Sequence, residues 1–96
     1  MSPLKKKKLN QLRIKLDKLD NKLIKVLKTR TNLVKKVLSL KEYKNQIIDK
    51  KRINKIMKNI KIKSINNNID PKITQRIWIN MIYAYIDYEK RNFKKK

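Results

Sequence analysis

The sequence predicts an all-α protein, and three of its features support that class. Leucines and valines recur at alternating steps of three and four residues from Leu9 to Leu40, which is the spacing of one helix face. Glycine is absent and proline occurs only twice in 96 residues, so turns and hairpins lack their usual residues. No stretch shows the two-residue alternation of a half-buried strand. We therefore expect one long helix and two shorter ones.

The first predicted helix runs from Leu4 to Lys41, because nothing between them would stop it. At about 1.5 Å per residue it would extend roughly 55 Å, which is longer than a chain of this size is wide when folded. Its apolar face cannot be buried by the rest of its own chain, so we predict an obligate homodimer. We call this face the leucine seam: Leu9, Leu12, Leu16, Leu19, Leu23, Val26, Leu33, Val37 and Leu40.

Two start signals predict the shorter helices. After a break at residues 42–48, Asp49 suits the N-cap of a second helix, whose apolar face carries Ile53, Ile56, Met57 and Ile60. Residues 64–68 are polar and read as a connector. Asp70 followed by Pro71 is the clearest start signal, for a third helix that carries Ile73, Ile77, Met81, Ile82, Tyr85, Ile86 and Phe93.

The composition excludes several function classes. Cysteine and histidine are both absent, which rules out disulfides, zinc fingers, catalytic triads and Cys–His nucleophiles. We expect no metal and no cofactor. No apolar run approaches the roughly 20 residues of a membrane span, and no apolar segment follows the basic residues 5–8 as in a signal peptide. The expectation is one cytoplasmic domain over residues 1–96, with basic ends at 1–8 and 94–96.

The net charge of +22, from 29 basic and 7 acidic residues, has two interpretations. A basic chain favours nucleic acid, an anionic membrane surface or an anionic small molecule as partner. Lysine, isoleucine and asparagine are also residues of A/T-rich codons, so a biased composition would leave most lysines as solvated surface. Arginine is the more informative cation where lysine is this abundant.

Between Val26 and Leu33, the spacing of the leucine seam calls for an apolar residue at position 30, and Arg30 stands there instead. Burying an unpaired guanidinium costs several kcal/mol, so Arg30 must meet an anion there, either an acid of a neighbouring helix or a ligand. Lys41 lies about three helical turns further on and projects to the same side. Arg13 lies roughly 100° round the helix from Arg30, so it would serve the same pocket poorly within one chain but could serve a partner's.

Three further polar residues are candidates, each with an ordinary structural alternative. Asp49 and Arg52 share one helical turn, where a cap and a weak surface ion pair would explain them. Glu89 lies one turn beyond Tyr85, on the side of the third helix predicted to face inward, although a glutamate is more often exposed.

Taken together, these stretches resemble the all-helical class of chorismate mutase. The matching pieces, spread over residues 9–93, are Leu12-Arg13, Leu16–Asp20, Leu27–Arg30, Val37–Lys41, Asp49–Arg52, Ile69–Pro71 and Ile77–Glu89. The resemblance implies an intertwined dimer of three-helix chains. It also implies rearrangement of chorismate to prephenate, in the phenylalanine and tyrosine branch of aromatic amino-acid biosynthesis, by chemistry that needs neither histidine nor cysteine.

The resemblance implies a role for each candidate. Arg13, from the partner subunit, and Arg30 would bind the substrate carboxylates. Lys41 would bind a carboxylate and the ether oxygen, and Glu89 would meet that oxygen from the other side. Asp49 and Arg52 would line the site near the ring hydroxyl, and Tyr85 would be a further substrate-binding residue.

The chain departs from the family pattern at three positions. Ile53 stands where the mutases usually carry glutamate, Tyr85 where a small hydroxyl residue is common, and Glu89 where glutamine is frequent. Glutamate at that last position contributes only when protonated. Ile53 and Tyr85 also resemble the isochorismate-pyruvate lyase branch, which yields salicylate and pyruvate. A basic nucleic-acid-binding protein and a non-catalytic helical protein are further alternatives.

Overall fold

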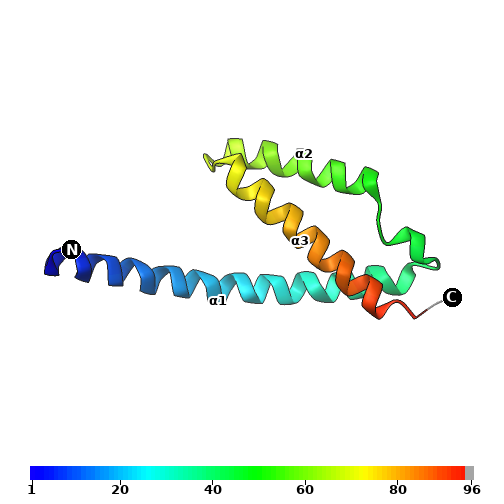
Figure 1. Ribbon diagram of the computed structural model, residues 1–96, viewed down its shortest axis with the longest axis horizontal. Coiled ribbons are helices and arrows are strands. Elements are labelled where there is room, and N and C mark those ends of the chain that lie inside the picture. Colours follow the sequence, from blue (N-terminus) through cyan, green and yellow to red (C-terminus); the bar gives the residue numbers. More distant parts are fainter. Residues whose placement is uncertain (95–96) are drawn as a thin grey trace. The chain divides into compact units, whose positions relative to one another are not determined.

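The computed structural model describes residues 1–94, so all but Lys94 of the predicted basic end at 94–96 lies outside the described residues. Three α-helices, α1 (Pro3–Leu40), α2 (Lys50–Asn66) and α3 (Pro71–Asn92), and a short 3₁₀-helix, η1 (Lys44–Gln46), account for its regular structure (Figure 1). No strand occurs in residues 1–94, so the all-α prediction is confirmed. The chain divides into two compact units, Met1–Leu33 and the residues from Val34 onward.

The first unit consists of Met1, Ser2 and most of α1. The helix begins at Pro3, where the missing amide proton of proline costs nothing, and the Ser2 hydroxyl accepts a hydrogen bond from the Lys5 amide at 3.2 Å. No residue of α1 is buried in the single chain. The leucine seam is instead open, with Leu16 and Leu23 each 58% exposed. No helix in the described part of the chain is long and apolar enough to cross a membrane.

The second unit has a small apolar core between α2 and α3. Figure 1 shows α3 folding back from the end of α2 within this unit. Ile82 and Ile86 of α3 are buried together with Ile47, which lies in the segment between α1 and α2. The predicted apolar face of α2 is confirmed, since its residues Ile53, Ile56 and Met57 pack against this cluster.

Both predicted helix starts are confirmed. An Asp49 side-chain oxygen accepts a hydrogen bond from the Arg52 amide at 3.0 Å and so caps α2. An Asp70 oxygen accepts one from the Lys72 amide at 2.9 Å, and Pro71 is the first residue of α3. These caps depend on local chemistry alone, which is why the sequence predicts them well.

The prediction of a connector at residues 64–68 is wrong for its first three residues. Helix α2 continues to Asn66, and Ser64 is buried. The Ser64 hydroxyl is hydrogen-bonded to the Ile60 carbonyl of its own helix and to the Thr74 hydroxyl of α3. These contacts satisfy the serine inside the helix, so its polarity does not end α2. The turn itself is made by Asn68 at a positive φ of 57°, a conformation that asparagine tolerates better than most residues.

Candidate functional site

The candidate site is centred on an ion pair between Lys41 and Glu89. The Lys41 ammonium donates a hydrogen bond to a Glu89 carboxylate oxygen at 2.9 Å, and the two side chains are 19% and 7% exposed. A charge-assisted hydrogen bond of this kind is stronger than a neutral one. Removing either partner would leave a charge in a poorly solvated place, which is costly. The pair therefore offers a polar ligand both a donor and an acceptor in a poorly solvated place.

Helix geometry explains why Glu89 faces inward. Ile82, Ile86 and Glu89 are spaced by four and three residues, so they share one side of α3, and all three are buried. The alternative that Glu89 is an exposed surface residue is therefore wrong. Tyr85 lies four residues before Glu89 and is half-buried, which puts it beside the ion pair on the same helix.

Lys41 lies just past the end of α1 rather than inside it. The helix ends at Leu40, one residue earlier than predicted, and the Lys41 amide donates to the Leu38 carbonyl at 3.1 Å. This last tightened turn leaves the Lys41 side chain at the start of the segment that leads to α2. Its position consequently depends on the path of residues 42–48.

Asp49 and Arg52 lie in the same unit, at the start of α2. Both are exposed, and the cap joins the Asp49 carboxylate to the Arg52 backbone rather than to its guanidinium. No ion pair between their side chains occurs in residues 1–94. The N-cap at Asp49 is thus confirmed, whereas the weak surface ion pair between Asp49 and Arg52 does not form. Ile53, the next residue, is half-buried and packs on the core.

The two remaining candidates belong to the first unit. Arg13 is exposed, and Arg30 is half-buried with an interaction partner of its own. Of the seven predicted site residues, the structure brings Lys41 and Glu89 into direct contact, with Tyr85 on the same helix face.

A comparison with protein families decides the membership of the chain. The family model described as chorismate mutase type II matches residues 12–90. The chain belongs to this family. The match includes every predicted site residue, from Arg13 to Glu89, and the resemblance seen in the sequence is confirmed. No curated protein and no solved structure gives a significant match.

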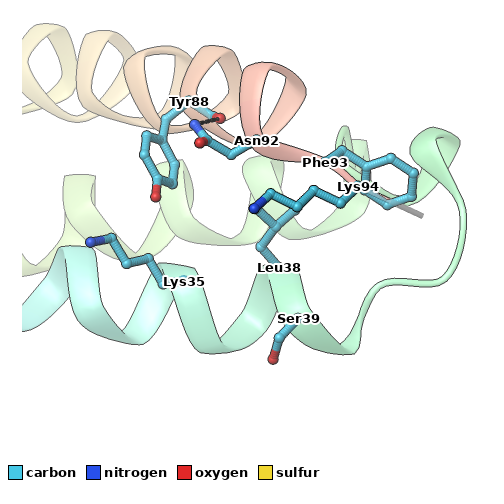
Figure 2. A pocket seen from close by; sticks show the side chains of 7 residues that line it. All are labelled: Lys35, Leu38, Ser39, Tyr88, Asn92, Phe93 and Lys94. Atoms are coloured by element: carbon cyan, nitrogen blue, oxygen red, sulfur yellow. Dashed lines mark hydrogen bonds between the residues drawn. The ribbon is translucent and has the colours of Figure 1, made fainter.

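This chorismate mutase type II chain also has a hollow whose lining includes neither Lys41 nor Glu89. Its volume is about 300 Å³, and Figure 2 shows the Tyr88 phenol pointing from α3 toward the end of α1 across it. The Asn92 amide beside it donates to the Tyr88 carbonyl at 2.8 Å. None of the predicted site residues is among those that line it: Lys35, Leu38, Ser39, Tyr88, Asn92, Phe93 and Lys94.

Sequence reasoning missed two residues that shape the site. Residues 42–48 were expected to be only a break between helices, yet Ile47 is 3% exposed and Gln46 hydrogen-bonds to the backbone beside Lys41. Two isoleucines immediately before a cap, Ile47 and Ile48, are an unusual pair for a solvated loop, so this signal was available for Ile47. Gln46 is the third residue after the N-cap Tyr43 of η1 and accepts from the Tyr43 amide, as glutamine does in a capping box. The usual serine or threonine is missing at position 43, which makes this signal weak in the sequence.

Proposed function

We propose that the chain is a chorismate mutase, an isomerase that converts chorismate to prephenate. Family membership supports the substrate class, and the observation that best supports the chemistry is the Lys41–Glu89 pair. It offers a cation and a carboxyl, 2.9 Å apart and poorly solvated, at the positions that the resemblance assigns to the ether oxygen of chorismate.

The proposed reaction needs charge stabilisation rather than a nucleophile. One carbon–oxygen bond of the ether breaks while a carbon–carbon bond forms, and no atom enters or leaves. Negative charge develops on the ether oxygen as its bond to carbon lengthens. The Lys41 ammonium would donate to that oxygen, and a fixed donor aimed at developing charge in a dry site lowers the barrier strongly. An arriving substrate would therefore compete with Glu89 for the ammonium.

Clamping the dicarboxylate would supply the rest of the rate enhancement. Arg30 and Arg13, the latter from a second copy of the chain, would hold the two carboxylates. Arg52 and Asp49 at the start of α2 would lie near the ring hydroxyl. Arginine suits this role because its planar fork binds carboxylates bidentately. Holding the substrate in its compact reactive conformation removes much of the entropic barrier before the reaction begins.

The proposed assembly is a homodimer of single-domain chains, joined through the leucine seam. A stripe of large side chains that are more than half exposed, including Leu12, Leu16 and Leu23, is costly in water. Each leucine that becomes buried contributes about 1.5–3 kcal/mol. A second copy offers the same stripe, so one interface would cover both.

Charging the seam is expected to dissociate the dimer. Leu12→Glu with Leu23→Glu would place two carboxylates in the interface, and the molecular mass measured by light scattering should fall to that of one chain, with loss of activity. Asn10→Glu with Asn21→Glu adds the same charge two residues away, on exposed positions off the seam, and should leave a dimer. A monomeric wild type would contradict the dimer.

Glu89→Gln is expected to keep most of the activity, because the glutamine side chain can accept a hydrogen bond from Lys41 and donate one to the ether oxygen. Glu89→Ala can do neither and should lower kcat/KM for chorismate. The measurement is kcat/KM for the wild type and both variants. An equal loss in Glu89→Gln and Glu89→Ala would contradict this role of Glu89.

Lyase activity on isochorismate is the second candidate, favoured by Ile53 and Tyr85. Ile53 packs on the core and offers no polar atom to a ring hydroxyl. The two activities are separated by supplying chorismate and isochorismate in separate reactions and comparing kcat/KM. The proposal expects prephenate from chorismate at the higher value. Salicylate and pyruvate from isochorismate, at the higher value, would replace it with the lyase.

A further inference from the structure

The segment between Lys41 and Asp49 is held by one side chain, that of Gln46. The Gln46 side-chain oxygen accepts hydrogen bonds from the amides of Glu42 at 2.7 Å and Tyr43 at 2.9 Å. These are the two residues that directly follow Lys41. Because one carbonyl oxygen satisfies both amides, it fixes the direction in which the chain leaves Lys41.

Gln46 is itself anchored in the second unit. It ends the single turn η1, where its amide donates to the Tyr43 carbonyl at 3.0 Å. The next residue, Ile47, is the most deeply buried apolar residue of the described chain, at 3% exposure, and packs with Ile82 and Ile86 of α3. The side chain that holds residues 42 and 43 is thus tied through its neighbour to α3.

Together with the ion pair, these contacts connect Lys41 to α3 in two ways. Glu89 lies on the same face of α3 as Ile82 and Ile86, and Lys41 bonds to Glu89. The first connection is through the backbone, because Gln46 holds the two amides after Lys41 and its neighbour Ile47 packs on α3. The second is the Lys41 side chain, which bonds to Glu89 of α3. The positions of Lys41 and Glu89 are therefore both set relative to α3, although Lys41 lies outside any helix.

We infer that Gln46 is a positioning residue that holds the Lys41 ammonium where the ether oxygen of the substrate must be met. The inference rests on the proposed function and adds a residue that does not touch the substrate. The two amides are exposed, so water would replace the lost hydrogen bonds and the fold would hardly be weakened. The direction of the chain after Lys41, however, would no longer be fixed.

The consequence should appear in kcat rather than in KM. Substrate carboxylates would still be bound by the arginines, whereas the contact of Lys41 with the ether oxygen strengthens only in the transition state. A displacement of about 1 Å in such a group lowers the rate by up to roughly 100-fold. Gln46→Ala is expected to lower kcat at least tenfold, with KM changed less than threefold.

Two variants make this test specific. Gln46→Glu keeps an oxygen that accepts both amide hydrogens and should restore most of kcat. Asn45→Ala changes the neighbouring exposed amide of the same turn and should behave as wild type. The urea midpoint of unfolding should be nearly the same in all four proteins. A Gln46→Ala enzyme with wild-type kcat would overturn the inference.

Amide hydrogen exchange gives a readout that does not depend on activity. Exchange at Glu42 and Tyr43 should become faster in Gln46→Ala and slow again in Gln46→Glu. If the wild type does not convert chorismate, the proposed function fails, and with it the catalytic part of the inference. Slow exchange in the wild type that becomes fast in Gln46→Ala would still show that Gln46 holds residues 42 and 43 in place. Unchanged exchange in Gln46→Ala would contradict the claim that Gln46 fixes these residues, whatever the activity.

Discussion

Lys41→Ala is expected to lower kcat/KM for chorismate by about 10²- to 10³-fold, the usual loss when one donor to a developing oxyanion is removed. The ammonium is held at 2.9 Å from Glu89 in a place that is only 19% exposed. Water entering the gap would be a weaker and poorly oriented donor. The measurement is steady-state kinetics at a pH where the wild type is most active.

Lys44→Ala is the matched control for this variant. Lys44 lies three residues further on in the same segment, is exposed and loses the same charge on substitution. It should retain nearly all wild-type activity. Comparable losses in both variants would show that overall positive charge matters and that the placement of Lys41 does not.

Loss of Lys41 also leaves the Glu89 carboxylate buried without its partner, which is destabilising. The unfolding midpoint in urea should therefore fall in Lys41→Ala and recover in the double variant Lys41→Ala with Glu89→Gln, which removes the stranded charge. Activity should not recover in the double variant. Recovery of activity together with stability would mean that Lys41 is structural only.

Arg30→Ala is expected to have an effect of similar size, about 10²-fold or more in kcat/KM, expressed largely as a higher KM. Removing a charged partner from a substrate carboxylate costs about 2–5 kcal/mol when the pair is desolvated. Arg30 is half-buried at the one seam position that is not apolar, so it holds its charge in a restricted place.

Arg30→Lys tests the geometry of that contact. Lysine keeps the charge but binds as a single point rather than as a fork, so it should recover only part of the loss. Lys28→Ala removes an exposed cation two residues away and should leave KM nearly unchanged. Full turnover by Arg30→Ala would contradict the assignment of the carboxylate site.

The parts of this fold that were predictable are those fixed by local chemistry. The caps at Asp49 and Asp70 and the burial of Ile82 and Ile86 on α3 follow from residue type and spacing. The apolar residues Ile73 and Ile77 near the start of α3 are instead exposed in the single chain, and Phe93 lies just past its end. The end of α2 was mispredicted because the Ser64 hydroxyl finds partners inside the fold. Such partners exist only once two helices have packed, so polar composition is a poor guide there.

The candidate site likewise has a part that was predictable and a part that depends on how the chain packs. The family resemblance implied that Lys41 and Glu89 would both meet the ether oxygen of a ligand, but not that they would bond to each other across 48 residues of chain. That contact depends on the path of residues 42–48, which Ile47 and Gln46 set through burial and two side-chain hydrogen bonds. The isoleucine pair at positions 47 and 48 hints at burial, and Gln46 is a residue type found at the third position of a capping box, but no serine or threonine at position 43 marks the start of such a box.

The central claim is that this chain accelerates the rearrangement of chorismate, and product identification tests it most directly. Purified protein is mixed with chorismate alone, with a chelator present, and the products are followed by nuclear magnetic resonance. The account predicts prephenate as the sole product, one molecule for each chorismate consumed, at a rate proportional to protein concentration. Chorismate that decays no faster than in buffer, or that releases pyruvate instead, would contradict it.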